Sequence, residues 1–137
     1  MVLGTRSGSG FGPGFQSAES KLYRAEYGAS TLLILAYLGY TWMRPGGLDL
    51  PFTVLWFLLP DMAAFIPIGL SSRRREWPAW GSYLYNVFHN ALVWGAVFAV
   101  SWLIMGGPYS PLLGWLLHIT LDRAAGFGLR SHDRRGA

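Results

Sequence analysis

The chain has 137 residues, of which 52% are hydrophobic and only 13% are charged. Soluble domains carry about 25% charged residues, so this composition argues against an ordinary soluble domain. The sequence contains no cysteine, which excludes disulfides and thiolate metal sites. The net charge of +4 would suit a nucleic acid, but no basic face interleaved with aromatic residues is present, and we expect no nucleic-acid binding.

Residues 1–20 are rich in glycine and serine and predict a flexible tail. They contain no apolar core followed by a small-residue cleavage site, so we expect no cleaved signal peptide.

The residues that follow predict an all-α polytopic membrane protein with four transmembrane helices in one domain, residues 21–130. A helix needs about 20 apolar residues to cross about 30 Å of hydrocarbon. The predicted spans are residues 23–43, 50–70, 80–105 and 109–129. A soluble helical bundle fits less well, because a helix that is apolar all round is buried in protein or lipid. Residues 131–137 form a charged C-terminal tail.

The basic residues predict the orientation of these spans, because cytoplasmic loops retain lysine and arginine. Ten of the eleven fall on one side of the predicted membrane, and Arg44 lies alone on the other. The ten are Arg6, Lys21, Arg24, Arg73, Arg74, Arg75, Arg123, Arg130, Arg134 and Arg135. Both termini are therefore expected in the cytoplasm. Several tryptophans near the predicted span ends suit the membrane interface: Trp42, Trp77, Trp80 and Trp102.

Four ionisable residues interrupt the apolar spans: Asp61, His89, His118 and Asp122. The first three fall near the middle of their predicted spans, and Asp122 lies one helical turn from His118. Each such group costs about 2.5–3.5 kcal/mol in the membrane, so each needs a partner. One explanation is that they hydrogen-bond one another and hold the helices together. The other is that they form a functional site.

The functional explanation predicts a metal site with Asp61, His89, His118 and Asp122 as ligands and catalytic residues. Imidazoles and carboxylates suit Zn, Mn or Fe(II), and such a metal activates water for hydrolysis. Pro60, just before Asp61, removes a backbone hydrogen bond and loosens the helix there. The sequence has no GxSxG elbow, P-loop or GxGxxG fingerprint, which removes serine-hydrolase and nucleotide-binding interpretations.

Five further residues are predicted to support this site. Tyr85 and Asn86 share a helical stripe with His89 and can orient its imidazole or hydrogen-bond a ligand. The alternative is that they form an interhelical hydrogen-bond ladder. Glu26 is expected to form an ion pair with Arg24 or Arg123. The last helix is expected to end at Gly126 and Gly128, because glycine serves as a helix C-cap.

Four segments carry a resemblance to a known family: LYRAEYG (22–28), FLLPD (57–61), YNVFHN (85–90) and LLHITLDRAAGFGLR (116–130). In order and spacing they resemble the DUF4260 family, small four-span bacterial membrane proteins of unknown function. The resemblance implies the bacterial inner membrane. It also implies a polar signature at Arg24, Glu26, Asp61, Asn86, His89, His118, Asp122, Arg123, Gly126 and Gly128. Members usually carry serine where this chain has Asn90, and they usually continue into a different C-terminal tail.

A more distant resemblance concerns Leu-Pro-Asp, then a histidine in the next span, then His-x3-Asp, as in proposed membrane-bound metal-dependent hydrolases. The His-Arg that precedes the histidine in those proteins is missing here. Three hypotheses follow. In the first, the chain is a metal-dependent hydrolase of a lipid or lipid-linked substrate. In the second, it is a non-enzymatic small subunit or assembly factor of a larger membrane complex, with a pigment bound through a histidine as a special case. In the third, it is a proton or solute carrier.

Overall fold

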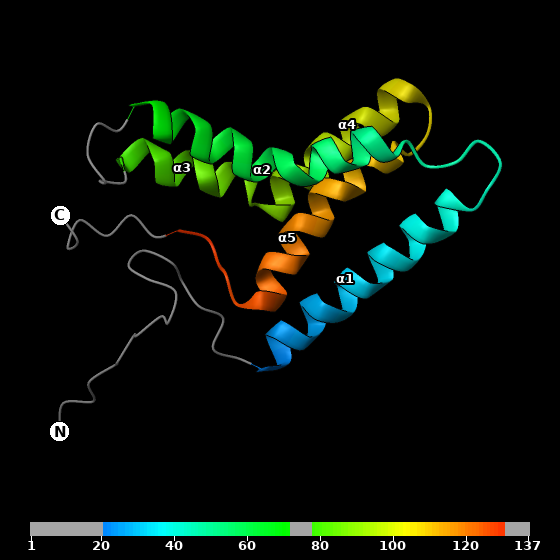
Figure 1. Ribbon diagram of the computed structural model, residues 1–137, viewed down its shortest axis with the longest axis horizontal. Helices are drawn as coiled ribbons and strands as arrows, with labels where there is room; N and C mark the ends of the chain where they lie inside the picture. Colours follow the sequence, from blue (N-terminus) through cyan, green and yellow to red (C-terminus); the bar gives the residue numbers. More distant parts are fainter. Residues whose placement is uncertain (1–20, 72–77, 131–137) are drawn as a thin grey trace.

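The computed structural model describes residues 21–71 and 78–130, and these are all-α, as predicted (Figure 1). The helices are α1 (Lys21–Trp42), α2 (Leu50–Ser71), α3 (Ala79–Phe88), α4 (Ala91–Met105), the 3-10 helix η1 (Ser110–Leu112) and α5 (Leu113–Ala125). The expectations for the two tails, for Arg73, Arg74 and Arg75 and for Trp77 lie outside the described residues.

Helix α5 is the centre of the fold, since it packs on both α1 and α2, while α2 also packs on α3. Figure 1 shows α2 and α3 side by side, and the first turn of α1 beside the last turn of α5. The buried core is small and lies along α5 and η1, where Leu112, Trp115 and Ile119 form one cluster. This arrangement brings the middle of α2, the end of α3 and the middle of α5 together.

The close approach of α5 to α2 depends on Gly114. A Cβ atom at this position would overlap the carbonyl oxygen of Thr53 and lie 3.1 Å from the backbone nitrogen of Phe57. Only a residue without a side chain therefore lets the two backbones touch. His118 lies one turn further along α5, so this contact also sets the distance from His118 to α2.

The third predicted span is divided into two helices that are bent by 51° at His89 and Asn90. Asn90 is the N-cap of α4, and its Oδ1 accepts a hydrogen bond of 2.8 Å from the backbone N–H of Leu92. Asparagine side chains compete with the helical backbone in this way, which is why a long apolar run did not reveal the break. The residue that bears the buried imidazole, His89, therefore caps the C-terminus of α3.

Gly126 ends α5 as expected, with a left-handed φ of 99°. The N–H of Phe127 then bonds the carbonyl of Asp122 at 2.8 Å, as in a glycine-terminated helix. Gly128 lies beyond the helix and has no left-handed backbone.

The four predicted transmembrane spans are not confirmed. Among the described residues, one helix is long and apolar enough to cross a membrane, Leu50–Leu70 of α2, and α3 with α4 qualifies if the bent pair counts as one span. Helix α1 has 22 residues but does not pass the same test, and α5 has only 13. One or two apolar helices suggest a membrane protein only weakly.

Helix α4 nonetheless leaves a large apolar surface uncovered. None of its residues is buried, and Leu92, Leu103 and Ile104 are 83%, 84% and 79% exposed. Several large apolar side chains of α1 are exposed as well, including Leu32 and Leu33.

Candidate metal centre

The four ionisable residues singled out in the sequence lie together where α2, α3 and α5 meet. Nε2 of His89 is 3.2 Å from Nε2 of His118, and Oδ1 of Asp61 lies 3.3 and 3.4 Å from these two nitrogens. Oδ2 of Asp122 lies 3.5 Å from His89 and 3.4 Å from His118. Three helices therefore contribute to one polar centre.

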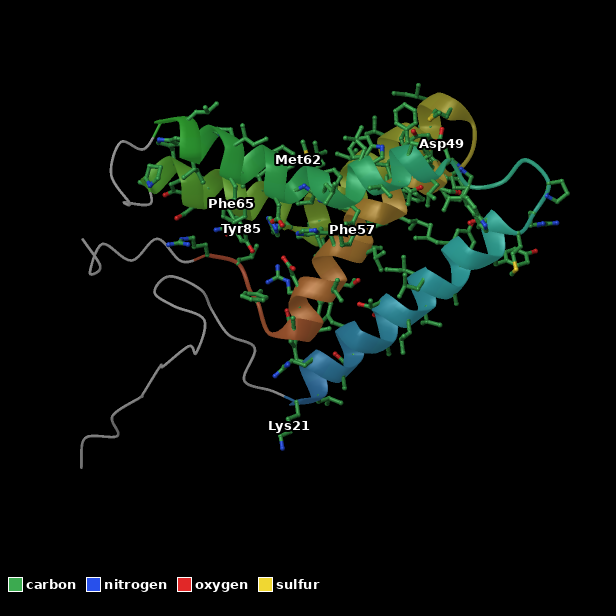
Figure 2. All side chains as sticks on the ribbon, in the orientation of Figure 1. Lys21, Asp49, Phe57, Met62, Phe65 and Tyr85 are labelled. Atoms are coloured by element: carbon green, nitrogen blue, oxygen red, sulfur yellow. The ribbon has the colours of Figure 1, made fainter. Side chains whose placement is uncertain are left out.

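Aromatic rings fix both imidazoles. The ring of Tyr85 stacks on His89, with centroids 3.7 Å apart, and Phe57 meets His118 edge-on at 5.2 Å. In Figure 2 the labelled Phe57 and Tyr85 lie on the side of α2 and α3 that faces α5. The two histidine side chains are 3% and 7% exposed, whereas the carboxylates are 50% exposed in Asp61 and 29% in Asp122. The centre thus has a buried nitrogen side and an open oxygen side.

Hydrogen bonds to the backbone determine which imidazole nitrogen carries the proton. Nδ1 of His89 lies 2.8 Å from the carbonyl oxygen of Tyr85. Since a carbonyl only accepts, Nδ1 of His89 donates, and Nε2 of the neutral ring presents a lone pair to the centre. The ring of His118 is likewise hydrogen-bonded to the backbone of Phe57. Its Nε2 faces that of His89 at 3.2 Å, so the pair needs a proton or a cation between the two nitrogens.

Two side chains of α5 satisfy the carbonyls that the end of α3 leaves open. Nε1 of Trp115 donates to the carbonyl of Phe88 at 2.6 Å, and Nη2 of Arg123 donates to the carbonyl of His89 at 3.1 Å. The last carbonyls of a helix have no partner inside it, so such donors stabilise a helix end. Helix α5 therefore holds the backbone of His89 as well as supplying His118 and Asp122.

The hydrogen bonds of Asn86 are close to the ladder between helices that was expected as the alternative. Asn86 does not orient the imidazole. Its Nδ2 donates to the carbonyl of Arg130 at 2.7 Å, and its Oδ1 accepts from the N–H of Arg130 at 2.6 Å. This pair of bonds ties the segment after α5 to α3.

The expected ion pair of Glu26 is not formed within the described parts of the chain. Glu26 is exposed, and Arg24 instead donates from Nε to the carbonyl of Ala124 at 3.0 Å, while Arg123 reaches the carbonyl of His89. Both arginines thus bond carbonyls at helix ends, where acceptors are unsatisfied.

Sequence reasoning missed two residues that build the centre, Gly114 and Trp115. Trp115 lies three residues before His118, and Gly114 lies four before it, so both share the face of α5 that carries the histidine. This spacing was the available signal, but only the fold shows that the glycine touches α2 and that the indole reaches α3.

Three of the ligand atoms have the spacing of a metal site. The group consists of Asp61, His89 and His118, and the distances among its ligand atoms are 3.2, 3.3 and 3.4 Å. A tetrahedral zinc ion with bonds of about 2.0–2.1 Å separates its ligand atoms by about 3.3 Å. The three atoms thus match one face of such a tetrahedron. Asp122 stands beside the same two nitrogens.

Comparison with known proteins agrees with the resemblance of the sequence segments. No significant match to a curated protein or to a solved structure was found. Residues 21–135, most of the chain, match the family described as "Domain of unknown function (DUF4260)", and the chain belongs to that family.

Proposed function

We propose that the protein is a membrane-embedded, metal-dependent hydrolase that acts on a lipid or lipid-linked substrate. Asp61, His89 and His118 hold the metal. The observation that carries the proposal is the pair of buried Nε2 atoms, 3.2 Å apart, with the half-exposed Asp61 carboxylate within 3.4 Å of both. Buried polar groups at this spacing require a shared proton or a cation, and the nearby carboxylates favour a cation.

Three protein ligands leave the fourth tetrahedral position to water, as in catalytic zinc sites. A bound divalent ion lowers the pKa of such a water to about 7 and so supplies hydroxide at neutral pH. Zinc is the first choice among Zn, Mn and Fe, since two imidazoles and a carboxylate in a tetrahedral arrangement suit it best. We assign Asp122 the role of proton acceptor rather than fourth ligand, because the group of ligand atoms close enough to share an ion comprises Asp61, His89 and His118, while Asp122 lies 3.4 Å from His118 beside it.

The membrane assignment is supported by the uncovered apolar surface of α4 and α1. Soluble monomers rarely expose apolar patches larger than a few hundred Å². We further propose four spans in a bacterial inner membrane with both termini cytoplasmic, because the basic residues fall almost entirely on one side of the predicted spans. Retention in the membrane fraction after an alkaline wash tests this assignment, and release of the protein into the wash contradicts it.

One observation favours a second candidate function. Because α4 contributes no buried residue, its surface could also be covered by another protein, as in a non-enzymatic subunit of a membrane complex. In that case the polar centre serves only to hold the three helices together.

Metal analysis of the detergent-purified protein separates the two candidates. We expect about one equivalent of zinc per chain, its loss in Asp61→Asn and His118→Ala, and its retention in Asp122→Asn with loss of hydrolysis. Glu26→Gln is the matched control, since Glu26 is an exposed carboxylate with no ion pair in the described residues. A folded protein without metal contradicts the hydrolase. If Asp122→Asn also loses its zinc, Asp122 is a fourth metal ligand, as the sequence predicted.

A further inference from the structure

The segment that follows α5, residues 126–130, lies against the stacked rings of Tyr85 and His89. It starts at the left-handed turn that ends the helix, and Figure 1 shows it run from the end of α5 back toward α3. Phe127 and Gly128 of this segment line a small hollow together with Tyr85 and His89. Between these described residues the hollow has no room for a water molecule. We call residues 126–130 the cover, because water does not fit between them and His89.

Two side chains hold the cover at its ends. Before its start, Nε of Arg24 donates to the carbonyl of Ala124 at 3.0 Å, which ties the last turn of α5 to α1. At its end, Nδ2 of Asn86 donates to the carbonyl of Arg130 at 2.7 Å, and Oδ1 of Asn86 accepts from the N–H of the same residue at 2.6 Å. A primary amide has both the donor and the acceptor that one residue's backbone requires. Asn86 is therefore suited to fix the backbone of the cover to α3.

The groups under the cover are those that orient His89. Its Nδ1 lies 2.8 Å from the carbonyl oxygen of Tyr85, and the two rings are stacked with centroids 3.7 Å apart. A hydrogen bond is strongest where water is excluded. Water that reached the carbonyl of Tyr85 would compete for the proton on Nδ1. The imidazole would then be free to turn, and its Nε2 would leave the metal.

We propose that Asn86 is a positioning residue of the metal centre, which holds the cover closed over His89 and so slows release of the metal. Asn86 acts on His89 through the cover and not by contact with the imidazole. This inference rests on the proposed hydrolase and concerns how its metal is retained. The carboxylate of Asp61 is 50% exposed, so substrate reaches the ion from the oxygen side of the centre without displacement of the cover.

Transfer of zinc from the zinc-loaded full chain in detergent to an excess of chelator tests this role. We expect Asn86→Ala to release zinc about tenfold faster than wild type, because two hydrogen bonds of the cover are lost. Asn86→Gln keeps both polar groups on a longer side chain, so a smaller increase is expected. The glutamine variant carries the test if Asn86→Ala does not fold.

Asn90→Ala is the matched control, since it removes the other asparagine of the chain. Oδ1 of Asn90 accepts from the N–H of Leu92 at the start of α4, away from the cover. This variant loses a side-chain hydrogen bond as well, and we expect it to release zinc at the wild-type rate.

Reaction of His89 with diethyl pyrocarbonate in the metal-free chain is the second readout, followed by mass spectrometry of peptides. A merely structural tie would not change the reactivity of His89 in the folded protein. We expect His89 to react faster in Asn86→Ala than in wild type, and at the wild-type rate in Asn90→Ala. In a protein that binds zinc, a wild-type rate of Asn86→Ala in either assay overturns the role of Asn86 and leaves the hydrolase standing. A folded chain that binds no zinc overturns the hydrolase, and the modification of His89 alone then decides whether the cover shields it.

Discussion

The junction of α2, α3 and α5 can be compared with the helix α4. The two regions differ in how far their side chains and backbone carbonyls are covered by the rest of the chain. At the junction, both imidazoles are buried, and the open carbonyls of Phe88 and His89 receive donors from α5. Helix α4 contributes no buried residue and exposes Leu92 and Leu103 almost fully. The junction is therefore buried within the chain, whereas α4 is largely exposed and reaches the core only through partly buried side chains such as Trp94 and Phe98. Substitutions at the junction should disturb both stability and metal binding, whereas matched substitutions on α4 should leave metal binding unchanged.

Substitution of Gly114 by alanine has the largest expected effect. The added methyl group overlaps the carbonyl oxygen of Thr53, so α5 must move away from α2. We expect the free energy of unfolding to fall by about 3 kcal/mol, the upper range for overpacking. We also expect zinc to be lost, because His118 moves with the helix. Chemical unfolding in detergent measures the first effect, and metal analysis the second.

Gly95→Ala on α4 is the matched control. A methyl group there meets no atom within 4 Å, and alanine stabilises a helix interior relative to glycine by about 0.5–1 kcal/mol. The same chemical change is thus expected to have opposite signs in the two regions. If Gly114→Ala were as stable as wild type and kept its zinc, the close contact of α5 with α2 would not position His118.

Trp115→Phe tests whether α5 holds the end of α3. The variant keeps an aromatic ring but leaves the carbonyl of Phe88 without its donor, which costs about 1–3 kcal/mol. Zinc affinity is expected to fall as well, because the freed carbonyl belongs to the residue before His89.

Trp94→Phe provides the comparison within the second region. Nε1 of Trp94 donates to the carbonyl of Leu112 at 2.8 Å, so this variant also loses one indole bond, but away from the metal centre. We expect a similar loss of stability with unchanged zinc affinity. Equal zinc affinities in the two variants would show that Trp115 stabilises the fold without positioning His89.

The sequence predicted which ionisable residues form the centre, but it did not predict the helix break and the helix contacts that position them. Asp61, His89, His118 and Asp122 stood out because charged or titratable groups are costly in apolar helices, and the structure brings all four together. The break between α3 and α4 was missed, because the hydrophobicity of a continuous apolar segment is the same whether the segment forms one helix or two. The contacts of Gly114 and Trp115 were missed because they depend on which helix lies opposite. The amino-acid composition does not show which helices are neighbours. For the same reason the expected ion pair of Glu26 was wrong, since Arg24 and Arg123 bond backbone carbonyls instead.

Asn90, between the two regions, has the smallest expected effect. Its side chain caps α4, and a serine side chain caps a helix equally well. We therefore expect Asn90→Ser to leave stability and zinc binding unchanged. Asn90→Ala should cost about 1 kcal/mol, because the N–H of Leu92 loses its acceptor. Hydrogen exchange of the first turn of α4 measures this loss. Since α4 contributes nothing buried, the fraying should stop there, and zinc affinity should stay at the wild-type value. A drop in zinc affinity in Asn90→Ala would instead show that the bend at His89 depends on the cap, and that α4 contributes to the metal centre after all.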